Sequence, residues 1–336
     1  MNDRAEPVAP PAATGELVGD AALVACFSRS SPRLGGASLA VMQLAEAMAP
    51  YVSHAVGQLR AFEAEHVREG ASGDRAPVDF SSHFLRYVLN LALVRHRAGI
   101  FRSKHGRPMR ILDVGGLGIV SEELVRDDNL QLHRTSGDLR RRFELGTCAA
   151  YDLVLCTEVV EHVCDPELGF VGDPARDYNA EVSAVGVLRC LERLALSLTS
   201  EAALYLTTPN ALSLYALREL GNRRPAAIYR PHYREYTPRE LFGLLGAAGL
   251  DALLTTVEVY PFYDYSAEVD FLEKVGAPDA RRFRGDTIAC FAGLPRRSAE
   301  SREIDARYLE VLVRVTGREA FAPRGGLDAL IADRLG

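Results

Sequence analysis

One short segment constrains the fold more than any other, because it places an acid and a glycine turn directly after a strand. Arg110–Val114 has the length and apolar character of a buried strand, and Gly115–Gly118 follows it at once. A helix-like stretch, Val120–Val125, comes next. This order places backbone N–H groups at the carboxyl edge of a parallel sheet, where open α/β sheets bind ligands. The segment therefore predicts an α/β fold with a ligand site at that edge.

The rest of the chain repeats the alternation of strand and helix. Further strands are predicted at Tyr151–Cys156, Ala203–Thr207, Leu253–Val259 and Thr287–Ala292. An amphipathic helix is predicted over Ser183–Thr199. A second helix runs from Pro238 to Gly249, with Thr237 as N-cap and Glu240 closing a capping box. Such alternation is typical of a doubly wound, mostly parallel sheet.

The two flanks of the sheet region read as helical. In the N-terminal flank, the pattern predicts a helix over Ser38–Glu69, interrupted at Pro50, and another over residues 82–97. We expect a disordered tail over residues 1–16, a helical N-terminal extension or lid over 17–107, a sheet domain over 108–293 and a helical C-terminal extension over 294–336. Helix 82–97 and the C-terminal extension could build a pocket lid or the contact of a homodimer.

Composition narrows the classes of function. The 336 residues carry 45 acidic and 39 basic side chains, a net charge of −6, which argues against a broad nucleic-acid surface. No apolar run approaches the length of a membrane span, and the N-terminus lacks the apolar core of a secretion signal. The six cysteines never form C-x-x-C, so they read as reduced thiols. These features predict a cytoplasmic protein with neither a nucleic-acid nor a membrane partner.

Two linked motifs carry a family resemblance. Leu112–Gly118 followed by Tyr151–His162 resembles class I S-adenosylmethionine-dependent methyltransferases. Later blocks of that family are similar, in the expected order, to Leu204–Asn210, Pro231–Pro238, Leu244–Leu250 and Arg284–Ala289. The resemblance covers about residues 108–293. It implies a Rossmann-like methyltransferase fold with a mostly parallel seven-stranded sheet, and S-adenosylmethionine as cofactor.

The resemblance also implies which residues approach the cofactor. Near its methionine part we expect Asp113 and the glycines that let the backbone come close, Gly115, Gly116 and Gly118. Leu117 departs from the family, where a glycine is common at this point. Thr157 and Glu158 are expected at the cofactor as well.

The family places an acid after the second strand to bind both ribose hydroxyls, and Asp138 is the candidate here. Only twelve residues separate Asp138 from Tyr151, too few for a full helix and strand. Asp138 could therefore lie near the adenine instead, or be an ordinary turn residue.

A cluster of carboxylates and imidazoles suggests a divalent metal such as Mg²⁺. Glu158, Glu161 and His162 follow a strand, and His232 is expected at the same edge of the sheet. Two carboxylates and two imidazoles could form an octahedral site. A similar arrangement binds metal in the small-RNA 2′-O-methyltransferases. In methyltransferases without metal, the Glu-His pair orders the loop and contacts cofactor or substrate.

An oxygen nucleophile must lose its proton, and His232 is the first candidate for the base because an imidazole titrates near neutrality. Tyr233 and His162 are alternatives, as is Glu161 acting through a metal. In the simpler interpretation, His232 only caps a loop and Tyr233 packs in the core.

Three functions follow from these features. The first is methylation of a small molecule, on a hydroxyl of a sugar or secondary metabolite. The second is metal-dependent 2′-O-methylation of an RNA end, against which the acidic charge balance weighs. The third is a catalytically silent scaffold that binds the cofactor, since a fold does not guarantee its usual function.

Overall fold

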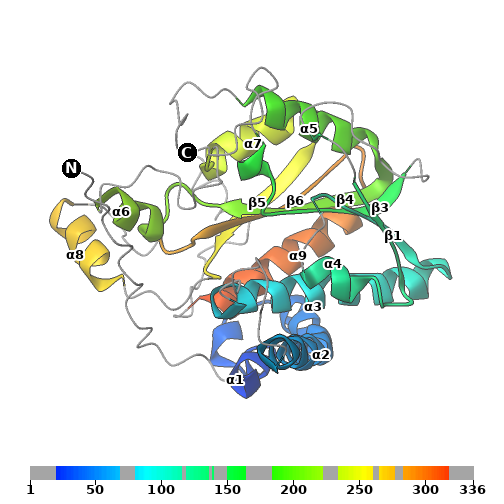
Figure 1. Ribbon diagram of the computed structural model, residues 1–336, viewed down its shortest axis with the longest axis horizontal. Helices are drawn as coiled ribbons and strands as arrows, with labels where there is room; N and C mark the ends of the chain where they lie inside the picture. The colour runs from blue at the N-terminus through cyan, green and yellow to red at the C-terminus, as the bar shows by residue number, and fades with distance from the viewer. Residues whose placement is uncertain are drawn as a thin grey trace.

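A mixed, six-stranded sheet forms the centre of the protein (Figure 1). The computed structural model describes residues 20–68, 80–115, 119–135, 138–139, 150–163, 184–221, 234–259, 265–276 and 283–317. The strands are β1 (Met109–Asp113), β2 (Leu130–Arg134), β3 (Tyr151–Thr157), β4 (Leu198–Pro209), β5 (Asp251–Val257) and β6 (Thr287–Gly293). Their order across the sheet is β2-β1-β3-β4-β6-β5.

The strand directions place the ends of β1 to β4 at one edge. Strand β1 is parallel to β2 and β3, and β3 is parallel to β4, whereas β6 is antiparallel to both β4 and β5. Within the described residues there are six strands, not the seven expected, and the sheet is mixed. Most of the stretch between β2 and β3 lies outside the described residues.

Helices cover both faces of the sheet (Figure 1). On one face lie α1 (Asp20–Ala25), α2 (Leu39–Arg68), α3 (Phe80–His105), α4 (Ile119–Leu124) and α9 (Ala299–Thr316). The other face carries α5 (Val185–Leu196) and α7 (Pro238–Ala247). The helices α6 (Leu214–Gly221) and α8 (Ser266–Lys274) contact each other beside the sheet, and two short 3-10 turns are η1 (Pro32–Leu34) and η2 (Val160–His162). None of the helices in these ranges is long and apolar enough to cross a membrane.

The expected interruption of the first long helix at Pro50 is wrong, because α2 continues through the proline. A proline inside a helix removes one backbone hydrogen bond and crowds the preceding turn. Met48 and Val52 are both fully buried against the neighbouring helices. Burial of such side chains stabilises by about 1.5–3 kcal/mol each, enough to offset the local cost.

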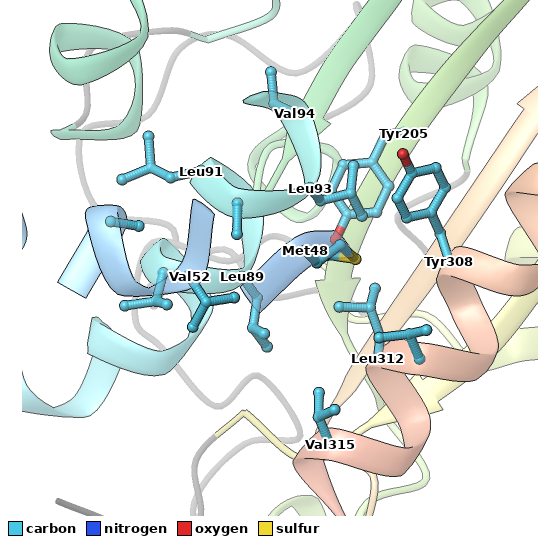
Figure 2. Close-up of a cluster of buried hydrophobic side chains, with 14 of the residues drawn as sticks. Met48, Val52, Leu89, Leu91, Leu93, Val94, Tyr205, Tyr308, Leu312 and Val315 are labelled. Atoms are coloured by element: carbon cyan, nitrogen blue, oxygen red, sulfur yellow. The ribbon is translucent and has the colours of Figure 1, made fainter. Parts of the chain in front are cut away.

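The flanking helices share one apolar core with the sheet (Figure 2). The cluster includes Leu89 and Leu93 of α3, Tyr205 of β4, and Tyr308 and Leu312 of α9, and Leu93 lies next to Tyr205. Side chains alternate along β4, so that Tyr205 faces α3 and α9 while Leu204 and Leu206 face α5 and α7. Helix α3 is thereby fixed against the sheet, next to the strand ends. The boundaries expected for the flanks and the sheet domain stay predictions.

The start of α7 is set by its own sequence. Thr237 Oγ1 accepts a hydrogen bond from the Glu240 N–H, and the Glu240 carboxylate accepts one from the Thr237 N–H, at 3.2 and 2.8 Å. The capping box is therefore present as predicted. It fixes the chain that leads from the strand ends into α7.

Candidate active site

A cavity of about 270 Å³ lies where β1 and β3 end. Its wall contains four of the residues expected at the cofactor, namely Asp113, Gly115, Thr157 and Glu158. Side chains of α3 and α4 complete it, together with Tyr205 of β4. The ends of adjacent parallel strands thus converge on one cavity, as the sequence predicted.

Asp113 is the last residue of β1 and is almost completely buried. Its carboxylate accepts a hydrogen bond from the Ser121 hydroxyl of α4. Burial raises the pKa of Asp113 to about 6, while the Ser121 hydrogen bond and the charge of Arg134 lower it. Asp113 is therefore mostly ionised at pH 7 and titrates just below neutrality.

Gly115 occupies a backbone conformation that other residues rarely adopt. Its φ is +76°, and a Cβ placed on it would lie 3.0 Å from Cγ2 of Val159. The Gly115 N–H donates to Thr135 Oγ1 at 3.2 Å, which ties the turn to the end of β2. A side chain at Gly115 would thus suffer both backbone strain and a steric clash.

The other residues of the cofactor set cannot be placed in the cavity. Gly116 and Gly118 lie outside the described residues. Asp138 is half-buried, and it is not among the described residues that line the cavity. Its expected contact with the ribose or adenine stays a prediction.

Glu158 directly follows β3 and is joined to α3 by an ion pair. Its carboxylate Oε2 lies 2.7 Å from Arg86 Nη1, with 15% and 11% of the two side chains exposed. The backbone of Glu158 has φ +56°, and its N–H donates to the carbonyl of Thr207 on β4 at 2.8 Å. Arg86 also lines the cavity. The charged groups among the described residues that line the cavity are the guanidinium of Arg86 and the carboxylates of Asp113 and Glu158.

Several polar lining residues were missed by the sequence prediction. They include Arg86 and Asn90 of α3, and Tyr205 of β4. The Tyr205 hydroxyl donates to Asn90 Oδ1 at 3.1 Å, and both side chains are buried. Helix 82–97 was one candidate for a pocket lid, but nothing in its periodicity shows which polar side chains of the helix turn toward the strand ends.

Glu161 lies in η2 and is fully buried. Thr208 Oγ1 donates to its Oε2 at 2.9 Å, while its Oε1 has no hydrogen-bond partner. Burial, and then the charge of Glu158, raise the pKa of Glu161 well above its usual value. Burial thus favours the protonated form of the Glu161 carboxyl.

The candidate bases are only partly placed by the structure. The imidazole Nε2 of His162 is 3.9 Å from Glu161 Oε1, and the ring is partly exposed. His232 and Tyr233 lie outside the described residues. The segment that follows them is anchored at the strand ends, because the Arg234 N–H donates to the Glu161 carbonyl at 3.4 Å.

The expected metal site is not supported by the residues that can be placed. Within the described ranges, no three His, Cys, Asp or Glu side chains could together hold a metal ion. Glu158 is already paired with Arg86, and burial raises the pKa of Glu161 well above its usual value. Divalent cations bind ionised carboxylates, so these two groups do not fit such a site.

Comparison with known proteins gives a structural likeness only. No protein-family model matches the sequence, and no curated protein matches it either. The fold is similar to that of a SAM-dependent methyltransferase from Archaeoglobus fulgidus, with 17% identity, 65% of this chain and 99% of that chain covered, and a TM-score of 0.41. The fold is also similar to that of the plantazolicin methyltransferase BpumL in complex with SAH. The two sequences are 14% identical, 72% of this chain and 98% of that chain are covered, and the TM-score is 0.37.

A third similar structure is a putative O-methyltransferase from Nostoc punctiforme PCC 73102, with 12% identity, 72% and 69% coverage and a TM-score of 0.32. All three are described as methyltransferases, the class that the sequence motifs resemble.

Proposed function

We propose that the protein is an S-adenosylmethionine-dependent methyltransferase that acts on a small molecule. The observation that carries this proposal is the cavity at the ends of β1 and β3, in which Asp113, the left-handed Gly115 and Glu158 meet. These are the positions at which the motif resemblance expects the cofactor. The proposal thus joins a sequence pattern to a cavity found at the same residues.

The charge of the cavity wall suits this cofactor. Its charged described residues are Arg86, Asp113 and Glu158, which together carry a net charge of −1 when both acids are ionised. S-adenosylmethionine carries a sulfonium, an ammonium and a carboxylate, and is therefore a net cation. A negative wall in a partly enclosed cavity attracts a cation more strongly than an exposed surface does. We expect Asp113 to attract the cationic groups, because its carboxylate is the more deeply buried of the two.

When bound, the cofactor supplies an activated methyl group on its sulfonium. The protein then has to orient the acceptor in line with that methyl group and exclude water. Buried side chains from both faces of the sheet enclose the strand ends, including Asn90, Tyr205 and Glu161. A hydroxyl acceptor must also lose a proton, for which His232 and Tyr233 are the proposed groups. The segment after them begins at η2, because the Arg234 N–H donates to the Glu161 carbonyl.

The acceptor class rests on the sequence alone. The blocks Leu204–Asn210 and Pro231–Pro238 resemble those of sugar and cell-surface polysaccharide methyltransferases, which favours a hydroxyl of a sugar or secondary metabolite. The net charge of −6 is unfavourable for binding RNA. Among the described residues, those proposed for a metal do not form a site, so no observation favours methylation of an RNA end. A cytoplasmic location and a homodimer are proposed on the sequence features alone.

A turnover experiment tests the proposal. The protein is incubated with a metabolite extract and S-adenosylmethionine carrying an isotopically labelled methyl group, and products are detected by mass spectrometry. We expect a labelled small molecule and an equivalent amount of S-adenosylhomocysteine. Cofactor binding without either product would support the silent scaffold and contradict the proposed catalysis.

A further inference from the structure

We propose that Arg86 of α3 is a positioning residue, which shapes the cofactor cavity through Glu158 and not by contacting the cofactor. This inference rests on the proposed function for the identity of the ligand. Its geometric part rests on the described residues alone. In this role, α3 would set the shape of the cavity as well as cover it.

The first step is the backbone of Glu158. Its φ of +56° lies in the left-handed region, in which residues with a Cβ are strained, and it is the non-glycine residue with positive φ among those described. Such a conformation persists only where the surroundings hold it. Here the backbone is held by the hydrogen bond to the Thr207 carbonyl and the side chain by the ion pair with Arg86.

The second step leads from Glu158 to the glycine turn. Val159 comes next in the chain, and its Cγ2 lies 3.0 Å from the point that a Cβ of Gly115 would occupy. The isopropyl group thus packs directly on the backbone of the turn. Glu158 therefore sets the position of Val159, and Val159 limits the position of Gly115. This chain of contacts joins α3 to the turn at which the cofactor is expected.

The third step is what Arg86 prevents. Oε1 of Glu158 is buried without a hydrogen-bond partner, and the charge of Glu158 already acts on the buried Glu161. Without the guanidinium, the Glu158 carboxylate would be left poorly solvated beside another acid. We expect the residue to turn toward solvent and relax its backbone, which would move Val159 off Gly115. Helix α3 can hold Arg86 in place because Asn90, one turn further on, is bonded to Tyr205.

The test is a double-mutant cycle with S-adenosylhomocysteine as the probe, measured by isothermal titration calorimetry. The variants are Arg86→Met, Glu158→Gly, the double variant and Arg86→Lys. Arg86→Met should weaken binding about tenfold, the effect of 1.4 kcal/mol. Glycine adopts the left-handed conformation without help and carries no carboxylate. Adding Arg86→Met to Glu158→Gly should therefore change the affinity less than about twofold, within the error of additivity for uncoupled sites. Arg86→Lys should restore part of the loss.

An equal loss of affinity on Arg86→Met in both backgrounds would overturn the inference, because Arg86 would then contact the ligand itself. The control is Arg218→Met, which removes a partly buried ion pair with Glu268 at 2.6 Å, far from the cavity lining. It should leave the affinity unchanged. If the wild-type protein binds no S-adenosylhomocysteine, the proposed function fails. The thermal midpoints of the wild type, Arg86→Met, Glu158→Gly and the double variant then decide the inference. Additive changes in the midpoint would contradict the coupling of Arg86 and Glu158.

Discussion

Acid should destabilise the protein through one buried histidine, His96, at the junction of α3 and α9. The side chain is almost fully buried, and its Nδ1 is hydrogen-bonded to the Tyr308 hydroxyl at 2.7 Å. The ring also meets Tyr51 edge-on, with centroids 5.4 Å apart. Burial lowers the pKa of His96 to about 4, because the imidazolium would lose its hydration.

Acid lowers the free energy of unfolding because the unfolded chain binds a proton at His96 more tightly than the folded protein does. In the unfolded chain His96 takes up a proton near its ordinary pKa of about 6.5, whereas the folded protein stays neutral at this site until about pH 4. Protonation therefore favours the unfolded state, and stability is lost as the pH falls through this window. Between pH 7 and pH 5 the loss from this residue amounts to about 2 kcal/mol.

The assay is urea unfolding of the wild type and of His96→Gln at pH 7, 6 and 5. Glutamine keeps a polar partner for Tyr308 and does not titrate. The wild type should lose about 2 kcal/mol more than the variant between pH 7 and pH 5. The comparison with the variant cancels the other titrations, including that of Asp113, whose raised pKa acts in the opposite direction. Equal losses in both proteins would refute the reasoning.

Three further predictions concern the cavity. The affinity for S-adenosylmethionine, measured by calorimetry, should fall as the pH drops below 6, because the pKa of Asp113 is about 6 and the cationic ligand favours its ionised form; a constant affinity from pH 7 to 5 would contradict this. Gly115→Ala should weaken binding of the cofactor more than about tenfold. The control is Gly249→Ala, because Gly249 has nearly the same φ (+77° against +76°) but no neighbour within 4 Å of an added Cβ. This control should leave the affinity unchanged. Tyr205→Phe should lower the free energy of unfolding by about 1–3 kcal/mol in urea titrations, because it leaves the buried Asn90 oxygen without its donor; an unchanged midpoint would show that this bond contributes nothing.

The sequence correctly predicted those elements that are stabilised by residues close to one another in the chain. The apolar strand before Gly115 and the capping box of Thr237 and Glu240 are both present, since each needs only contacts within a few positions. The start of β4 was missed by five residues, because Leu198–Ala202 is partly polar and exposed and resembles the end of a helix. Its pairing with β3 extends back to Leu198, opposite Tyr151, which no local pattern reveals.

The candidate site depends on contacts between distant segments, and there the sequence was less informative. Asp113 and Glu158 were expected at the cavity because strands of one direction end at one edge. Arg86 precedes Glu158 by more than seventy residues, and their ion pair arises only from the packing of α3 on the sheet. At Pro50 the local sequence favours a helix break, but α2 continues because Met48 and Val52 on either side are buried in the core.

Binding of S-adenosylmethionine to the wild-type protein tests the central claim most directly. Isothermal titration calorimetry at pH 7.5 should give saturable binding of one cofactor per chain, and Gly115→Ala should abolish or strongly weaken it. A wild-type protein that unfolds cooperatively, and is therefore folded, yet gives no saturable binding would contradict the assignment of the cavity to this cofactor.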